Sequence, residues 1–275
     1  DLAWAAGDAQ AKGFLIGATS GRTTLNGEGL QHQDGHSHVL SSTIPNCLSY
    51  DPAFAYEVAV IIKDGIKKMY VDKENYFYYI TTTNENYEHP PMIEGAEESI
   101  IKGMHKIENA ENPDIRLIGS GAILRESIRA KSILDTYNIK SEVWSVTSFN
   151  LLRKDGMEVE RFNQLNPDLD EKISYVEECF DGKSIPVIAS TDYMRSYAEQ
   201  IRPYIKAKYN VLGTDGYGRS DSREMLRGFF EINASSIVRA SAYSLFKEGT
   251  IDKKQLDIIY NDMGVDPSKP NPWEV

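Results

Sequence analysis

IRLIGSG, residues 115–121, decides the fold of this chain. Its apolar first half predicts a buried strand, and its two glycines predict a tight turn that leads into a helix near residues 122–137. The glycines do not form a dinucleotide-binding fingerprint, because Leu124 occupies the position of the third glycine. The stretch therefore predicts a strand that feeds directly into a helix.

The same succession continues toward the C-terminus. Strands are predicted at residues 141–146, 185–190 and 209–213. Helices are predicted in three further regions: near residues 193–202, from Asp221 and Arg223 onward, and around residues 241–247. Such alternation predicts an α/β fold, with a mostly parallel sheet that is flanked by helices on both faces.

The first third of the chain contains a second strand–helix series. Strands are predicted at residues 14–17, 46–50 and 76–83, and the first is expected to be buried. A helix is predicted after the second strand, with Asp51 as its N-cap and Pro52 in its first turn. The core-facing side of this helix is predicted from apolar residues at 3- and 4-residue spacing: Ala55, Val58, Ala59, Ile62, Ile66 and Met69.

A break separates the two series. Pro90-Pro91 interrupts the chain, a short helix and a connecting strand are predicted within residues 94–106, and the charged segment 108–114 contains Pro113. We therefore predict three parts: a first domain of residues 1–90, a connector of residues 91–113 and a second domain of residues 114–275.

Composition excludes several classes of protein. The 275 residues suffice for one large or two ordinary domains, and the net charge of −11 argues against a nucleic-acid partner, which needs a basic surface. No apolar run is long enough to span a membrane, so no membrane partner is expected. Cys47 and Cys179 match no metal or redox motif and are expected to be free thiols in a reducing cytoplasm.

Residues 25–38, LNGEGLQHQDGHSH, form the strongest candidate site. Three of the five histidines, His32, His36 and His38, lie within seven residues, together with Asp34. No hydrophobic period runs through the segment and three glycines loosen it, so we predict a loop, here called the histidine loop. The residues alone leave three interpretations open: a metal site, solvated polar histidines, or an acid–base and substrate-orienting loop.

Motifs along nearly the whole chain resemble one family. They are GRTTLNGEGLQH (21–32), DGHSH (34–38), TIPNC (43–47), YDP (50–52), TNENY (83–87), LIGSG (117–121), SVTSF (145–149), ASTDY (189–193) and LGTDGYGRSDSR (212–223). In this order they resemble the homodimeric bacterial pyruvate dehydrogenases, the thiamine-diphosphate-dependent first components of the pyruvate dehydrogenase complex. DGHSH is also similar to the acidic-Gly-x-x-His segment of transketolases, which share the architecture.

The resemblance implies a fold, cofactors and partners. Residues 1–90 would be the later part of a pyrimidine-binding domain, and residues 114–275 a transketolase-like C-terminal domain. The implied activity is oxidative decarboxylation of pyruvate, with thiamine diphosphate and magnesium, and transfer of the acetyl group to a lipoyl group. The implied partners are the upstream remainder of the enzyme, a second copy in a homodimer, and dihydrolipoyl acetyltransferase. Another transketolase-like thiamine enzyme, or an assembly fragment without activity, remains as an alternative.

The resemblance also assigns roles to residues. His38 matches the histidine that faces the cofactor-bound intermediate and orients its oxygen atoms, and Asp34 and His36 match loop-shaping or proton-relay groups. The remaining residues assigned to the substrate or cofactor loop are Glu28, His32 and Asn84. Asn84 stands where transketolases carry an arginine that holds a sugar phosphate, and this departure argues against a phosphorylated sugar as substrate.

The family's diphosphate and magnesium motif, Gly-Asp-Gly, is missing. Gly7-Asp8-Ala9 lacks the second glycine, and Thr214-Asp215-Gly216 lacks the first. The glutamate that activates the aminopyrimidine ring would precede Asp1. We therefore expect the isolated chain neither to bind thiamine diphosphate nor to decarboxylate pyruvate, and we expect its histidine loop to be mobile because nothing would cover it.

Overall fold

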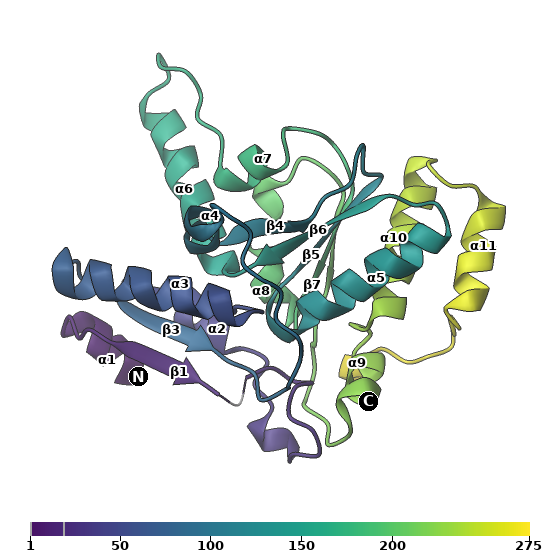
Figure 1. The fold of residues 1–275 in the computed structure, drawn as a ribbon, viewed down its shortest axis with the longest axis horizontal. Helices are drawn as coiled ribbons and strands as arrows, with labels where there is room; N and C mark the ends of the chain where they lie inside the picture. Colours follow the sequence, from purple (N-terminus) through teal and green to yellow (C-terminus); the bar gives the residue numbers. More distant parts are fainter. Residues whose placement is uncertain (1, 19) are drawn as a thin grey trace.

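Two β-sheets organise the computed structural model, which describes residues 2–18 and 20–275 (Figure 1). The first sheet has the order β1-β3-β2 and is parallel throughout. Its strands are β1 (Phe14–Gly17), β2 (Cys47–Tyr50) and β3 (Phe77–Thr81). All three predicted strands of the first series are therefore confirmed, and each lies within a residue or two of its expected start.

The second sheet has five strands in the order β4-β6-β5-β7-β8. Only β4 runs antiparallel to its neighbour among the described strands, so the prediction of a mostly parallel sheet is confirmed. The strands are β4 (Met104–Glu108), β5 (Ile115–Gly119), β6 (Ser141–Val146), β7 (Val187–Ser190) and β8 (Tyr209–Leu212).

Helices cover both faces of the second sheet, as the sequence predicted (Figure 1). Side chains of one strand alternate between the faces: Leu117 belongs to one hydrophobic cluster and Ile118 to the other. The first cluster packs under α5 (Leu124–Thr136), α10 (Ala234–Glu248) and α11 (Lys253–Asp262). The second packs under α6 (Phe149–Leu165), α7 (Tyr175–Cys179) and α8 (Arg195–Glu199).

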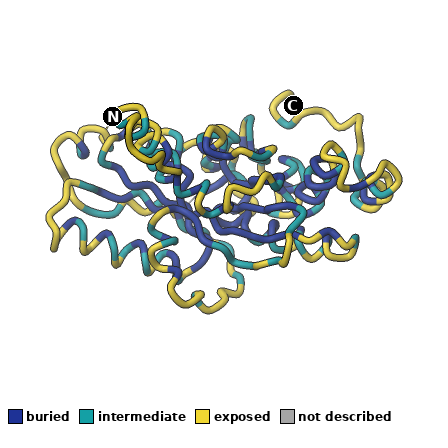
Figure 2. Tube along the Cα trace, turned by 90° about the horizontal axis from the view of Figure 1, so that it is seen from above, coloured by how far each residue is buried: buried dark blue, intermediate teal, exposed yellow. Residues whose placement is uncertain are grey.

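Burial follows this layering. In Figure 2 the buried backbone runs through the strands, and the exposed residues gather on the outer helices and turns. The helix predicted near residues 193–202 is α8 followed by a separate 3₁₀ turn, η4 (Arg202–Tyr204). None of the helices in the described ranges is long and apolar enough to cross a membrane.

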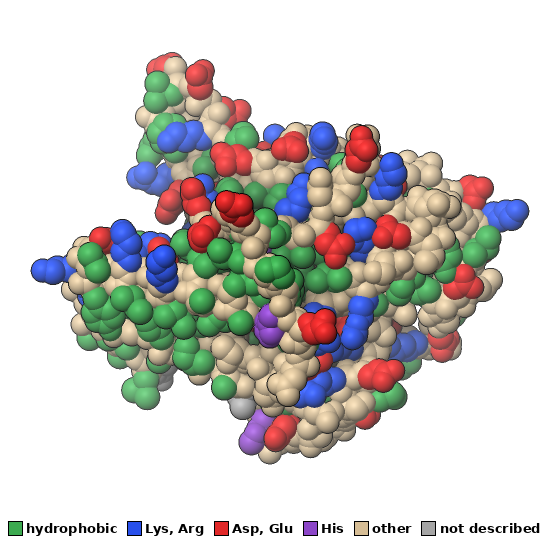
Figure 3. All heavy atoms as spheres, in the orientation of Figure 1, with side chains coloured by type: hydrophobic (Ala, Val, Ile, Leu, Met, Phe, Trp, Pro, Cys, Tyr) green, Lys and Arg blue, Asp and Glu red, His purple; other side chains and the backbone are tan. Residues whose placement is uncertain are grey.

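Strand β1 is not buried, contrary to the prediction. It lies at the edge of the first sheet, and Leu15 and Ile16 are 48% and 51% exposed. Figure 3 shows hydrophobic side chains gathered over the same part of the molecule, where α3 (Ala55–Ile66) and β1 lie. The apolar run identified the strand correctly, but an apolar run carries no information about which strand forms a sheet edge.

The predicted core-facing side of the first-series helix is confirmed only in part, since Met69 is buried and Ile62 packs against the same hydrophobic cluster. Helix α3 buries Glu57, Ile61 and Gly65, whereas Ala55, Ala59 and Ile66 are exposed. The buried stripe contains a carboxylate and a glycine, which a search for apolar spacing does not count. A Cβ atom on Gly65 would lie 2.7 Å from the Phe14 ring, so glycine permits the close approach of α3 to the sheet.

Asp51 is not the N-cap of α3. The residue before the helix is Phe54, and the Glu57 carboxylate accepts hydrogen bonds from the backbone N–H groups of Ala53 at 2.6 Å and Phe54 at 2.9 Å. The Asp-Pro pattern therefore identified the start of the helix three residues early, and the carboxylate of Asp51 is engaged elsewhere.

The predicted connector, residues 91–113, has secondary structure that joins the second sheet. It contains α4 (Glu97–Lys102) and β4, and β4 pairs with β6. The other Glu57 oxygen accepts hydrogen bonds from His105 in β4, at 2.7 Å, and from Ser145 in β6, at 2.6 Å. The part of the molecule built on the first sheet, here called the first lobe, therefore contacts the part built on the second sheet, the second lobe, through buried polar groups.

Candidate active site

The histidine loop contains two short helical turns, so the prediction of an irregular loop was only partly correct. Residues Leu30–His32 form the 3₁₀ turn η1, and residues Ser37–Ser41 form the short helix α2. Asp34 Oδ1 accepts hydrogen bonds from the backbone N–H groups of His36 and Ser37, each at 3.0 Å, and Ser37 Oγ donates to Asp34 Oδ2. Asp34 therefore shapes the turn that leads into α2.

His38 is fully buried, with a relative exposure of 0%. Its Nδ1 lies 2.6 Å from Ser49 Oγ, and its Nε2 lies 3.0 Å from Thr81 Oγ1. The ring stacks on Tyr197, with centroids 4.8 Å apart, and meets the edge of Tyr193 at 4.7 Å. The expectation that nothing covers the histidine loop is therefore wrong at this residue.

Burial also determines the charge of His38. Removal of the ring from water disfavours the imidazolium form and lowers the pKa of His38 to about 3, although Asp34 acts in the opposite direction. The side chain is therefore neutral at physiological pH. It has no exposed surface, and its geometry does not support direct contact with a ligand in this arrangement of the chain.

The other loop histidines face solvent. His32 Nδ1 lies 3.7 Å from Glu28 Oε2, and both side chains are about half exposed, at 54% and 51%. His36 is also exposed. The histidine loop therefore exposes a carboxylate–imidazole pair on its outer side and buries one imidazole on its inner side. The sequence of the loop, with three histidines in one polar segment, does not show which histidine is buried.

The second lobe holds the inner side of the loop. The backbone N–H of Met194 donates to the carbonyl of Gly35 at 2.8 Å, and Arg22 Nε donates to the carbonyl of Thr214 at 3.0 Å. A Cβ atom on Gly35 would lie 2.3 Å from Arg22 Nε, so a larger residue at position 35 would displace the Arg22 guanidinium. The loop is therefore anchored across the interface between the lobes.

Asp192 is a second anchor that sequence reasoning did not single out. Its buried carboxylate accepts hydrogen bonds from Thr23 Oγ1 at 2.7 Å and from the Thr23 backbone N–H at 3.1 Å. Burial raises the pKa of Asp192 to about 6, against the opposing effects of Arg227 and Thr23. The sequence offered two signals: Asp192 lies in the ASTDY motif (189–193), and it closely follows a predicted strand, where ligand and interface residues gather in α/β sheets.

Asp51 is a third buried carboxylate close to the loop. It accepts hydrogen bonds from Thr81 Oγ1 at 2.7 Å and from Ser120 Oγ at 2.8 Å. Burial raises its pKa to about 7, although both hydrogen bonds lower it. Since Thr81 also contacts His38, Asp51 belongs to the surroundings of the site and not to the end of α3.

Asn84 and its neighbour Glu85 lie beside the side chains of Arg125, Arg223 and Arg227, and this group of residues is here called the corner that contains Asn84. Arg223 Nη2 donates to Asn84 Oδ1 at 3.3 Å, while Arg125 donates to Glu85 at 2.9 Å and Arg227 donates to both Glu85 oxygens. A guanidinium group therefore reaches position 84 from α9 (Arg223–Phe229), although the chain carries no arginine there. Glu85 was missed because its partners lie 40 or more residues away.

The metal-site interpretation of the histidine loop requires several ligating side chains that lie close together. Across residues 2–18 and 20–275, no group of three histidine, cysteine or acidic side chains is placed to hold a metal ion. His38 is turned inward, and His32 pairs with Glu28 on the other side of the loop. The metal-site interpretation of the histidine loop therefore has no ligand set among these residues.

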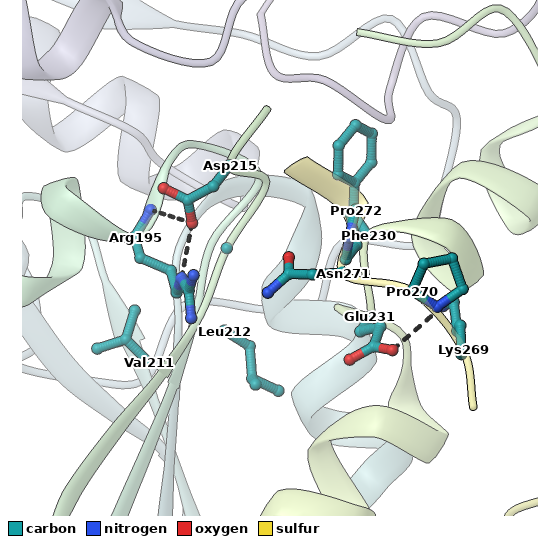
Figure 4. Close-up of a pocket in the computed structure, with 11 residues that line it drawn as sticks. Arg195, Val211, Leu212, Asp215, Phe230, Glu231, Lys269, Pro270, Asn271 and Pro272 are labelled. Carbon is teal, nitrogen blue, oxygen red and sulfur yellow. Dashed lines mark hydrogen bonds and ion pairs between the residues drawn. The ribbon is translucent and has the colours of Figure 1, made fainter. Parts of the chain in front are cut away.

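A separate cavity of about 230 Å³ lies at the carboxyl end of β8 (Figure 4). Arg195 pairs with Asp215 at 2.7 Å, and Lys269 pairs with Glu231 at 3.3 Å, so its charged groups already have partners. No residue of the histidine loop lines it. The cavity therefore does not form part of the candidate site.

Two family models match the chain. The pyruvate dehydrogenase E1 component middle domain matches residues 1–90, and the transketolase-like C-terminal domain matches residues 103–233. The chain is 56% identical to the pyruvate dehydrogenase E1 component of Pseudomonas aeruginosa, with all of this chain and 32% of that protein aligned. Along essentially its whole length the chain is similar to pyruvate dehydrogenase E1 components.

A second such protein, the pyruvate dehydrogenase E1 component of Escherichia coli K12, is 55% identical over 99% of this chain and 31% of its own length. The chain thus spans about a third of the length of these relatives. Among solved structures, a transketolase from Pichia stipitis has a TM-score of 0.65 and 16% identity, over 91% of this chain and 33% of that one. That likeness confirms the transketolase-like fold.

Proposed function

We propose that the protein containing this chain is the first component of a pyruvate dehydrogenase complex. It decarboxylates pyruvate oxidatively and transfers the acetyl group to the lipoyl group of dihydrolipoyl acetyltransferase. The observation that carries the proposal is 55–56% identity over essentially the whole chain to two proteins named pyruvate dehydrogenase E1 component. This similarity supports thiamine diphosphate as cofactor, with magnesium as its metal.

The cofactor supplies a nucleophilic carbon and an electron sink when bound. Because the chain lacks the family's Gly-Asp-Gly motif, we assign the magnesium–diphosphate anchor to the remainder of the protein. This chain contributes one wall of the site. Its proposed parts are the histidine loop and the corner that contains Asn84.

Within the histidine loop, the exposed pair of Glu28 and His32 is placed to exchange a proton with a ligand. An exposed imidazole beside a carboxylate is a side-chain pair of the kind that general acid–base catalysis uses. Asp34 and His36 shape the adjoining turn. The resemblance places His38 against the cofactor. In our proposal His38 acts indirectly, because its buried ring holds the histidine loop in position.

The experiment uses the full-length enzyme. We expect His32→Ala to lower pyruvate decarboxylation by roughly 100- to 10,000-fold, the range for a positioned acid–base group, with little change in cofactor affinity. We expect His38→Ala to lower it as well, because the loop that carries His32 then loses its buried anchor. Gln31→Ala is the matched control, because Gln31 is exposed in the same loop. Carbon dioxide release and acetylation of a lipoyl domain are measured separately. Wild-type turnover in both histidine variants would remove the loop from the mechanism.

A transketolase reaction is the second candidate, and one observation favours it. Arg223 brings a guanidinium group to Asn84, so a phosphate of a sugar substrate has a cation within reach of this corner. The two candidates differ in their substrates. Turnover of pyruvate without turnover of phosphorylated ketoses supports the first proposal, and the reverse result supports the second.

We further propose a homodimer in the cytoplasm. The net charge of −11 and the absence of a membrane-spanning helix among the described residues are compatible with this setting. Sedimentation of the full-length enzyme measures the oligomeric state directly. A monomer that decarboxylates pyruvate at the rate of the dimer would contradict a site shared between subunits.

A further inference from the structure

Asp51 lies where the two lobes meet and bonds to both of them. Its carboxylate accepts one hydrogen bond from Thr81, in β3, and another from Ser120, which precedes the turn η3 (Gly121–Ile123). Its backbone N–H donates to the carbonyl of Thr147 at 2.8 Å, and its carbonyl accepts from Gly121 at 3.0 Å. The residue is 3% exposed, so water does not compete for these bonds.

The carboxylate sets the direction of the hydrogen bonds around it. An ionised carboxylate accepts only, so both hydroxyl groups must donate their single proton to Asp51. Thr81 Oγ1 then has no proton left for His38, whose Nε2 lies 3.0 Å away. In this arrangement His38 Nε2 must carry a proton and donate it to Thr81.

The other ring nitrogen follows from the first. The lowered pKa keeps His38 neutral, and a neutral imidazole carries one N–H group. With the proton on Nε2, Nδ1 is an acceptor, and Ser49 Oγ at 2.6 Å donates to it. The five polar groups from Ser120 to Ser49 therefore form one chain whose bond directions follow from the Asp51 carboxylate. The Tyr50 carbonyl is a second, more distant acceptor for Thr81 Oγ1, at 3.3 Å against 2.7 Å for Asp51, and either bond directs the Thr81 proton away from His38.

We propose that Asp51 is a positioning residue which, through Thr81, fixes His38 as the Nε2–H tautomer and thereby holds the histidine loop in place. The geometry of the chain of bonds does not depend on the reaction. Its importance for turnover rests on the proposed function.

The position of His38 in the loop explains why its ring matters. His38 lies in the first turn of α2, and its carbonyl accepts a hydrogen bond from Asn150 Nδ2 at 2.9 Å. With both ring nitrogens and the backbone engaged, α2 is held to the first sheet and to the second lobe together. This attachment of α2 also orients Asp34 and His36, which precede the helix.

Ser120 connects the same carboxylate to the second lobe by hydrogen bonds. Ser120 Oγ lies 3.0 Å from Thr191 Oγ1, and Thr191 must donate because the Ser120 proton is directed to Asp51. A Cβ atom on Gly121 would lie 2.6 Å from Asp51 Oδ1, so only glycine leaves room for the carboxylate at this turn. Gly121 has φ +50, in the left-handed region that favours glycine.

The ionisation state of Asp51 decides the conditions of the test. Burial raises its pKa to about 7, the bonds from Thr81 and Ser120 lower it, and Asp192 and Asp34 raise it further. A protonated Asp51 would have a proton of its own to donate, and the direction of the chain would no longer be fixed. Measurement at about pH 8.5 keeps the carboxylate ionised.

The tautomer of His38 is read by ¹⁵N NMR of the full-length enzyme with labelled histidine. The His38 signals are assigned by their loss in His38→Gln. We expect a protonated Nε2 and an unprotonated Nδ1 in the wild type, and the same pattern in Thr81→Ser, which keeps the hydroxyl. In Thr81→Val and Asp51→Asn, which remove the acceptor or the charge, we expect a mixture of both tautomers.

The wild-type spectrum alone can overturn the proposal, so no variant has to fold for the test to succeed. A protonated Nδ1 in the wild type contradicts it. An unchanged Nε2–H tautomer in both Thr81→Val and Asp51→Asn contradicts it as well, since His38 would then be fixed by something other than Asp51.

Kinetics of the same proteins separate this inference from the proposed function. In Asp51→Asn we expect kcat for pyruvate to fall about 10- to 100-fold, the range for a residue that orients a histidine from behind, while KM stays nearly constant. Absence of pyruvate turnover in the wild type would reject the proposed function and leave the tautomer result standing. Full kcat in Asp51→Asn, despite a mixed tautomer, would reject the role of Asp51 in positioning.

Discussion

The side-chain amide of Gln33 pairs with both polar groups of the Arg219 backbone. The Arg219 N–H donates to Gln33 Oε1 at 2.7 Å, and Gln33 Nε2 donates to the Arg219 carbonyl. Gln33 is 4% exposed. Because a primary amide presents a donor and an acceptor side by side, it matches a peptide backbone as a neighbouring strand would, and it ties the histidine loop to the second lobe.

We predict that Gln33→Ala lowers the free energy of unfolding by about 1–3 kcal/mol, because it leaves buried backbone groups without partners. Gln31→Ala is the control, since Gln31 is exposed two residues away. Urea unfolding of both variants and the wild type gives the comparison. Equal losses in the two variants would show that the pair with Arg219 contributes nothing.

The ion pair between Arg227 and Glu85 gives a second prediction. Their side chains are 5% and 13% exposed, so Arg227→Met leaves a largely buried carboxylate with fewer partners and should cost about 3–5 kcal/mol in unfolding free energy. Lys253→Met breaks an exposed pair with Asp257 and should cost at most about 0.5 kcal/mol. A similar, small loss in both variants would contradict the buried-pair argument.

His38 should make stability depend on pH. Its pKa is lowered to about 3 in the folded protein, against about 6.5 in the unfolded chain, so only the unfolded state binds the proton between these values. Above about pH 6.5 neither state protonates His38, and the free energy of unfolding has its full value. As the pH falls toward 3 the unfolded state is stabilised by binding the proton, and the free energy of unfolding decreases by at most on the order of 4–5 kcal/mol. His38→Gln should flatten the stability profile over this range.

The control for the pH prediction is His36→Gln. His36 is exposed, so its removal should leave the dependence of unfolding free energy on pH as in the wild type. Both profiles are measured by denaturant unfolding at constant ionic strength. Parallel profiles for the wild type and His38→Gln would show that His38 is accessible to protons in the folded protein.

Limited proteolysis should cut the chain between residues 88 and 95. Residues 88–91 and 93–95 are exposed and lie outside helices and strands, whereas β4 pairs with β6 a few residues later. Mass spectrometry of the first products identifies the cleavage site. First cleavage within residues 104–113 would place the boundary where the charged segment suggested, beyond β4.

The isolated 275-residue chain should not bind thiamine diphosphate with magnesium. Its described residues offer no set of three metal-ligating side chains, and scattered donors do not offset the loss of freedom on binding, roughly 4–15 kcal/mol. Titration calorimetry with the cofactor and magnesium measures this directly. Micromolar affinity would reveal a diphosphate site within this chain.

The fold was largely predictable because its strands carry a strong local signal. β5 and β6 are buried on both faces, as strands of parallel sheets are, and both begin at the residues where the sequence predicted a strand. Helix α6 was missed because only its first turns pack on the sheet. Farther along, Met157 and Leu165 are exposed, and no apolar stripe runs the length of the helix.

The site was less predictable, because its important contacts join distant residues. Asp51 followed the local rule for an N-cap, yet its partners Thr81 and Ser120 lie 30 and 69 residues away. The cluster of histidines located the loop correctly. Whether His38 or His32 faces solvent depends on how α2 packs against Tyr193 and Tyr197, which the sequence of the loop does not contain.

Glu57 belongs to a helix of the first lobe, but one of its oxygens is satisfied entirely by His105 and Ser145 of the second sheet. Separating the lobes while each kept its shape would break these hydrogen bonds and would expose to water the apolar side chains of Ala53 and Phe54, which pack in one cluster with the second sheet. Cooperativity of unfolding therefore extends across both sheets. The unit that folds is the pair of lobes, and neither sheet gains its full stability before the other is in place.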